Sequence, residues 1–287
     1  MRLCPACQQA FEAPDVRCLH CGATPPSRDG IACFAPELAD SAEGFDPGAF
    51  ARLAEVEPRS FWFRSRNALI VELVPRWFPT ARSALEIGCG TGYVLQALHE
   101  RCGLRVTGTE LHPEGLRYAR ERLPDAELLQ VDARHIPFRE EFDLVGAFDV
   151  LEHIPEDEAV LREVRRATRP GGGLLLTVPQ HPGLWSQADD YAHHSRRYRR
   201  RELVEKVTRA GFRPLAVTSF VSVLLPAMAL SRVRARRAAS YDPWAEFDLP
   251  RRLDRALERL LAVERRVILR GASLPVGGSL ALAARAV

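Results

Sequence analysis

The stretch Leu85-Glu86-Ile87-Gly88-Cys89-Gly90-Thr91-Gly92 decides the fold class of this chain. It follows a short apolar run and precedes a segment with helical periodicity, which predicts a turn between a strand and a helix. Glycines in such a turn let the backbone bend sharply and approach a ligand with no Cβ in between. Dinucleotide-binding proteins have a similar loop, so the glycines alone do not identify the ligand.

Two residues beside this loop favour a nucleoside that carries an amino acid over a dinucleotide. Tyr93 stands where the third glycine of a G-x-G-x-x-G loop would fall. Glu86 precedes the loop inside the strand, and its carboxylate would attract an ammonium group but repel a pyrophosphate. We therefore expect Glu86 to face the amino group of a methionine moiety. A nicotinamide-dependent oxidoreductase remains the alternative.

Short apolar runs alternate with helix-period segments from residue 81 to 220, which predicts repeated βα units and a mainly parallel sheet. The expected strands are Ala84–Ile87, Arg105–Thr109, Glu127–Gln130, Leu144–Ala147, Gly173–Val178 and Pro214–Phe220. The expected helices are Tyr93–Arg101, Pro113–Arg122, Glu156–Thr168 and Arg201–Ala210. A glycine turn and an apolar run at residues 276–287 predict a last strand that returns to the sheet.

Carboxylates follow three further strands of the predicted sheet. Glu110, Asp132 and Asp149 come at or just after the second, third and fourth strands. Open α/β sheets bind ligands beyond the carboxyl ends of their strands, so with Glu86 these acids predict a ligand crevice. In it, Glu110 can accept from both ribose hydroxyls, and Asp132 from the adenine amino group while the Ala133 N–H faces the ring. Each acid alone could instead cap the next helix.

Five motifs carry a resemblance to a known family. The runs LEIGCGTG (85–92), GTELHPEGL (108–116), VDARHIPF (131–138), FDLVGAFDVLEHI (142–154) and RPGGGLLLTVPQH (169–181) resemble the class I S-adenosylmethionine (SAM)-dependent methyltransferases. The branch they most resemble includes ubiquinone-biosynthesis O-methyltransferases. The resemblance implies a Rossmann-like α/β fold, with a seven-stranded, mainly parallel sheet between helices and an antiparallel final strand. The predicted SAM site comprises Glu86, Gly88, Gly90, Gly92, Glu110, Leu111, Asp132, Ala133, Phe148 and Asp149.

Four cysteines form two tight pairs at the N-terminus, Cys4-x-x-Cys7 and Cys18-x-x-Cys21. Two such thiolate pairs complete a tetrahedral Zn²⁺ site, and four sulfur ligands leave no open position for catalysis. We therefore predict a small zinc ribbon whose metal is structural. Because Arg2 and Arg17 are its only basic residues before Arg28, we favour a packing role or a protein partner over nucleic acid.

The chain divides into a ribbon (1–30), a helical lead-in (31–80), a SAM-binding core (81–220), a helical insert or lid (221–275) and the final strand (276–287). A net charge of +3 is too small to predict nucleic-acid binding. The absence of a cleavable leader pattern and of a disulfide spacing predicts a cytoplasmic protein. Segment 221–237 joins an apolar run to arginines, so it could contact a membrane surface, although we favour a lid or dimer helix.

The expected reaction moves a methyl group from SAM to an oxygen, or less readily a nitrogen or carbon, of a small or lipid-linked acceptor. An oxygen acceptor must lose a proton, and histidine is suited to take it near neutral pH. Our candidates are His153, then His181, then His193 or His194, although each could serve only local structure. A non-catalytic adaptor that keeps the cofactor fold and acts through its ribbon is the remaining alternative.

Overall fold

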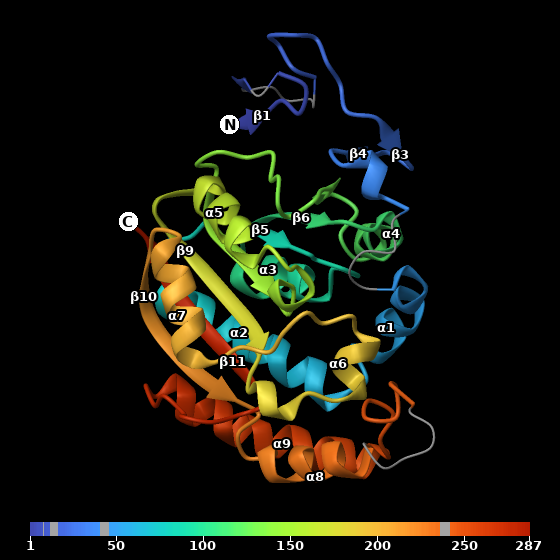
Figure 1. The fold of residues 1–287 in the computed structure, drawn as a ribbon, viewed down its shortest axis with the longest axis vertical. Helices are drawn as coiled ribbons and strands as arrows, with labels where there is room; N and C mark the ends of the chain where they lie inside the picture. Colours follow the sequence, from blue (N-terminus) through green and yellow to red (C-terminus); the bar gives the residue numbers. More distant parts are fainter. Residues whose placement is uncertain (8, 12–16, 41–45, 236–241) are drawn as a thin grey trace.

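The computed structural model describes residues 1–7, 9–11, 17–40, 46–235 and 242–287. Within these residues a nine-stranded sheet has the order β10-β11-β9-β8-β5-β6-β7-β4-β3 (Figure 1). Its strands are β3 (Ser27–Arg28), β4 (Ile31–Cys33), β5 (Ser83–Ile87), β6 (Arg105–Glu110), β7 (Glu127–Gln130), β8 (Phe142–Phe148), β9 (Thr168–Pro179), β10 (Phe212–Phe220) and β11 (Ser279–Ala286). Strands β4 to β9 pair in parallel, whereas β11 is antiparallel to both β9 and β10. The mainly parallel α/β fold and its antiparallel final strand are confirmed.

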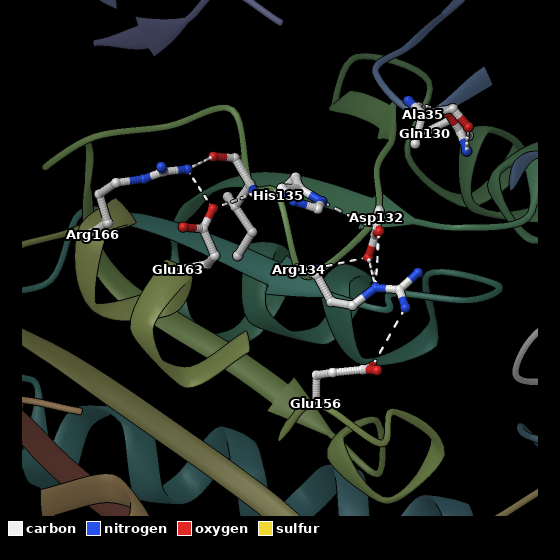
Figure 2. Close-up of polar contacts among 9 residues, drawn as sticks. Ala35, Gln130, Asp132, Arg134, His135, Glu156, Glu163 and Arg166 are labelled. Carbon is white, nitrogen blue, oxygen red and sulfur yellow. Dashed lines mark hydrogen bonds and ion pairs between the residues drawn. The ribbon is translucent and has the colours of Figure 1, made fainter. Parts of the chain in front are cut away.

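Two strands at the β7 edge are additional to the seven that we expected. β4 pairs in parallel with β7, and β3 forms a hairpin with β4. The Gln130 side chain fixes this edge, because its amide accepts from the Ala35 N–H at 3.0 Å and donates to the Ala35 carbonyl at 2.8 Å (Figure 2). The boundary at residue 30 therefore divides the β3–β4 hairpin. Strands of two and three residues are too short to show a periodicity.

Helices cover both faces of the sheet, because successive strand residues point to opposite sides. In β9, Leu175 packs with α2, α3 and α4, whereas Leu174 and Leu176 pack with α5 and α7. The helices are α1 (Phe50–Val56), α2 (Phe61–Trp77), α3 (Tyr93–Cys102), α4 (Pro113–Arg122), α5 (Asp157–Ala167), α6 (Gln187–Tyr191), α7 (Arg200–Arg209), α8 (Leu225–Ala235) and α9 (Arg251–Leu269). Single 3-10 turns are η1 (Pro36–Leu38), η2 (Pro47–Ala49), η3 (Leu151–His153) and η4 (Pro182–Leu184).

Within 221–275, the described residues include the helices α8 and α9. Leu261 and Ile268 of α9 are buried in the core, and Leu257 and Leu269 pack against it. The exposed apolar residues of the helix are Leu253, Leu260, Val263 and Val267. Arg236 and Arg237, which belong to the apolar–basic segment 221–237, lie outside the described residues. No helix in the described ranges has the length and apolar character needed to cross a membrane.

The N-terminal ribbon rests on the core at the end of the molecule opposite α9 (Figure 1). Its hairpin consists of β1 (Arg2–Leu3) and β2 (Ala10–Phe11). The Leu3 N–H donates to the Pro137 carbonyl at 3.0 Å, and Arg2 forms an ion pair with Glu127 of β7. The ribbon is therefore docked on the edge of the sheet by backbone and charged contacts.

Candidate functional site

A cavity of about 1090 Å³ lies at the carboxyl ends of the central strands. The glycine loop, the ends of β6 and β8, and residues of α1, α2 and α8 line it. Nine of the ten predicted SAM residues are in this lining: Glu86, Gly88, Gly90, Glu110, Leu111, Asp132, Ala133, Phe148 and Asp149. The tenth, Gly92, lies outside the lining and caps α3.

The three loop glycines adopt left-handed φ angles of +62°, +52° and +77° at Gly88, Gly90 and Gly92. A Cβ on Gly88 would lie 2.6 Å from a Val150 methyl, and one on Gly92 would lie 2.9 Å from the Ala119 backbone. At Gly90 the nearest atom would be 3.6 Å away. Gly88 and Gly92 therefore serve packing, whereas Gly90 leaves space beside the cavity.

Glu86 is a buried carboxylate at this cavity, with 3% of the residue exposed. Its Oε2 has no hydrogen-bond partner within the described part of the chain. Burial raises the pKa of Glu86 well above its usual value, and the nearby Arg66 charge opposes that rise only in part. A buried carboxylate without a hydrogen-bond partner is strongly stabilised by a nearby cation, and an ammonium group is such a cation.

Glu110 organises the turn around the loop. Its two carboxylate oxygens accept hydrogen bonds from the backbone N–H groups of Gly90 at 3.0 Å, Leu111 at 2.7 Å and His112 at 3.2 Å. Burial raises its pKa, and the His112 charge and these hydrogen bonds act in the opposite direction. The side chain is thus held in one orientation, with lone pairs remaining for a ligand.

Asp132 lies in a network that reaches across the rim of the cavity (Figure 2). The Arg134 side chain donates to both Asp132 oxygens at 3.0 Å and lies 3.4 Å from a Glu156 oxygen. Burial alone would raise the pKa of Asp132, but the hydrogen bonds from Arg134 outweigh it and the pKa lies below its usual value. Asp132 is therefore ionised and can accept a hydrogen bond from a ligand.

Arg66 is a site residue that our sequence analysis missed. It extends from α2, forms an ion pair with Asp149 and lies 4.9 Å from the centre of the Trp62 ring. Both Arg66 and Asp149 line the cavity, and Asp149 has a left-handed φ of +58°. The signal in the sequence was an arginine just after the aromatic run Phe61-Trp62-Phe63, but nothing there linked it to β8.

The predicted histidines occupy different surroundings. His153, His193 and His194 line the cavity, whereas His181 is not among the lining residues that the structure describes. The His153 and His194 rings are 4.7 Å apart, edge to face. Burial, together with the neighbouring His194, lowers the pKa of His153 to about 3. A group with so low a pKa is a weak proton acceptor at neutral pH.

His194 has a carboxylate partner that we did not anticipate. Its Nδ1 lies 3.0 Å from Oδ1 of the buried Asp189, which also accepts from Arg197 at 2.6 Å. Hydrogen bonds and charges from His194 and Arg197 outweigh burial and hold the pKa of Asp189 at about 2. The ionised Asp189 orients the His194 ring, with Nδ1 donating, so that Nε2 is the basic nitrogen.

Aromatic side chains form one wall of the same cavity. Phe63 lies 4.8 Å from Trp62 and 5.2 Å from Phe247, and Trp244 lies 6.2 Å from Phe247, measured between ring centres. Met228 of α8 also lines this part of the cavity. The wall is suited to the apolar body of a ligand, because aromatic and thioether groups pack well on apolar surface.

The ribbon cysteines converge on one point. The Sγ atoms of Cys4 and Cys21 are 3.6 Å apart, those of Cys7 and Cys18 are 3.7 Å apart, and all four lie within 4.8 Å of one another. Sulfurs at about 2.3 Å from a tetrahedral Zn²⁺ lie about 3.8 Å from each other. The four thiols therefore fit a zinc ion. Cys33, Cys89 and Cys102 are free thiols outside this cluster.

The match to a protein family falls on the segment that builds the cavity floor. The model of the methyltransferase domain family, methyltransferase type 11, matches residues 85–176, from within β5 into β9. Residues 85–176 therefore form a class I SAM-dependent methyltransferase domain. In this methyltransferase the matched segment contains all four predicted acids.

Curated relatives align over the same part of this methyltransferase. A Mycobacterium tuberculosis protein named "probable S-adenosylmethionine-dependent methyltransferase" is 28% identical over 171 residues, or 58% of this chain and 60% of that protein. A ubiquinone biosynthesis O-methyltransferase of Pseudomonas entomophila is 32% identical over 141 residues, or 46% of this chain and 56% of that protein. The chain thus spans 60% of the length of the first and 56% of the second.

Solved structures share the fold of this methyltransferase. Phosphoethanolamine N-methyltransferase 2 of Haemonchus contortus, in complex with SAM, has a TM-score of 0.57 at 20% identity and covers 91% of this chain and 61% of that one. The [4+2]-cyclase SpnF has a TM-score of 0.52 at 20% identity and covers 87% and 89%. Because a cyclase shares the fold, the fold alone does not determine the reaction.

Proposed function

We propose that this methyltransferase transfers a methyl group from SAM to an oxygen of a small acceptor with an apolar body. The observation that carries the proposal is the set of four acids and a glycine loop around one cavity, in the segment that matches the methyltransferase family. The cavity of about 1090 Å³ is slightly larger than most ligand pockets, which measure about 300–1000 Å³. It has room for a nucleoside and an acceptor together.

Each cofactor contact follows from a charge or hydrogen-bonding group described above. Glu110 accepts from the ribose hydroxyls, and Asp132 accepts from the adenine amino group. Glu86 pairs with the ammonium group of the methionine moiety. This contact gives the buried Oε2 of Glu86 the partner that it lacks within the described residues. Arg66 is suited to bind the carboxylate of that moiety, since its guanidinium pairs with Asp149 and both residues line the cavity. When bound, SAM supplies a methyl group activated by its sulfonium.

We further propose that His194, rather than His153, is the general base. Asp189 holds the His194 tautomer, as a buried carboxylate does for the histidine of a catalytic triad. His194 Nε2 takes the proton of the acceptor hydroxyl while the acceptor oxygen forms its bond to the methyl carbon and the carbon–sulfur bond breaks. His153 packs against the His194 ring and stays neutral, so it helps to position the ring.

Calorimetry with SAM and with NAD separates this function from an oxidoreductase. We expect the purified chain to release heat with SAM and with S-adenosylhomocysteine, and none with NAD, because Glu86 would repel a pyrophosphate. Release of S-adenosylhomocysteine in the presence of acceptor pools then tests turnover. Heat with NAD, or none with either nucleoside, would contradict the proposal.

The proposal for the ribbon is that Cys4, Cys7, Cys18 and Cys21 hold a structural Zn²⁺. We expect the Cys4→Ser variant to lose about one equivalent of zinc in elemental analysis. The ribbon should then lose its fold, because a module with so small a core depends on its metal. Cys102→Ser, which lies outside the cluster, is the control and should keep its zinc. Equal zinc content in both variants would rule out the site.

A further inference from the structure

The outer face of α9 exposes a continuous band of large apolar side chains, which we call the apolar stripe. It consists of Leu253, Leu260, Val263 and Val267, whose exposed fractions are 47%, 42%, 54% and 38%. Their spacings of seven, three and four residues place them on one side of the helix. Val223 extends the band, because its N–H donates to Glu264 of α9 and 40% of the residue is exposed.

A row of exposed arginines borders the stripe along the whole helix. Its members, which we call the arginine row, are Arg252, Arg255, Arg259, Arg266 and Arg270. Among the described residues none of these five forms an ion pair. Some exposed arginines elsewhere are paired: Arg201 with Glu205 at 2.7 Å, and Arg209 with Glu158 at 2.7 Å. The row is therefore a region of uncompensated positive charge.

The acids of α9 all turn away from this face. Asp254 and Glu258 bind Arg64 of α2 at 2.6 and 2.7 Å. Glu264 accepts from the N–H groups of Ser222 and Val223 at 2.8 Å. The outward side of the helix thus carries arginine and aliphatic groups with no carboxylate between them, which is the pattern of a helix that lies in a membrane interface.

We propose that this methyltransferase docks on an anionic phospholipid bilayer through the apolar stripe and arginine row of α9. The stripe would enter the boundary between headgroups and acyl chains, while the arginines contact lipid phosphates. Nucleic acid offers phosphates but no apolar layer for the leucines, and α9 has no aromatic residue to stack on bases. The surface is centred on α9, and of its residues only Val223 belongs to the segment 221–237 that the sequence pointed to.

Docking at this face would affect how the methyl acceptor reaches the cavity, an inference that rests on the proposed function. Leu257 of α9 lines the cavity, whereas the apolar stripe is on the outer side of the same helix, so α9 would lie between the proposed bilayer and the active site. An acceptor dissolved in the membrane could then reach the cavity without crossing water.

Flotation with vesicles tests the docking without any need for methyl transfer. We expect the full chain to float with vesicles of phosphatidylcholine containing phosphatidylglycerol, and not with pure phosphatidylcholine. The variant R255Q/R259Q/R266Q should partition about a hundredfold less, since each arginine near such a surface contributes about fivefold. The variant L260S/V263S should also lose binding. R169Q/R201Q/R209Q removes the same charge elsewhere and should float like the parent chain.

Thermal melts of each variant show whether it is folded, and all substituted side chains are exposed. The proposal is overturned if the parent chain does not float, including a result in which it binds only RNA or an acidic protein. It is equally overturned if both triple variants lose the same amount of binding, because net charge and not α9 would then be responsible. Loss confined to the α9 variants supports it, whether or not SAM binds.

Discussion

The His194→Ala variant is expected to lower kcat for methyl transfer to an oxygen acceptor by about 10² to 10⁴-fold, the usual effect of losing a general base. The reason is the proposed dyad with Asp189, in which Nδ1 of His194 bonds the carboxylate and Nε2 of this cavity-lining residue remains to accept a proton. Steady-state turnover with saturating SAM measures the change. KM for SAM should stay nearly constant, because His194 is not among the residues that hold the nucleoside.

Two further variants make this result interpretable. His181→Ala is the matched control, because His181 is not part of the cavity lining, and we expect near-parent turnover. Asp189→Asn should keep the His194 ring in position but favour the tautomer with its proton on Nε2. Its kcat should therefore resemble that of His194→Ala. Full turnover in both the His194 and Asp189 variants would show that the acceptor needs no base from this dyad.

The Glu110→Ala variant is expected to weaken SAM binding by about a hundredfold or more. It removes the proposed acceptor of the ribose hydroxyls, and hydrogen bonds to a charged group contribute about 1.5–3 kcal/mol each. It also frees the N–H groups of Gly90 and Leu111, so the glycine loop loses its anchor. Titration calorimetry measures the Kd directly.

A variant of an exposed acid serves as its control. Glu121→Ala removes a carboxylate from the exposed side of α4, and we expect a parent-like Kd. Glu110→Gln keeps the shape of the side chain and should bind SAM with intermediate affinity, because a neutral acceptor makes weaker hydrogen bonds. An unchanged Kd in Glu110→Ala would remove Glu110 from the cofactor site.

The sequence was most informative where a pattern extends over a whole element. The alternation of apolar runs and helical periods predicted six of the seven core strands, and the glycine turn and apolar run at 276–287 predicted the last. Strand β7 was predicted with the observed bounds, Glu127–Gln130. The acids at strand ends were found because parallel strands carry their carboxyl ends to one edge, whatever the details of packing. These signals depend only on local chemistry and on the topology of βα units.

Contacts between distant segments could not be predicted in the same way. Arg66 and Asp149 are 83 residues apart, and nothing in α2 indicates that its arginine reaches β8. The Asp189–His194 pair depends on the path of the loop after β9, which has no periodicity. Similarly, the apolar band of α9 is wider than the core needs, and sequence alone does not distinguish its buried half from its exposed half.

The two hydrogen bonds between the Gln130 side chain and the Ala35 backbone determine where this chain can be shortened. If a fragment began at residue 81, the β7 edge would lose β4 and present unpaired N–H and carbonyl groups, a template for self-association. That bare edge would lie at the strand that leads into Asp132, so trimming the N-terminus would also disturb the part of the cavity that Asp132 lines. A catalytic fragment should therefore retain the β3–β4 hairpin, even if the cysteine module is removed.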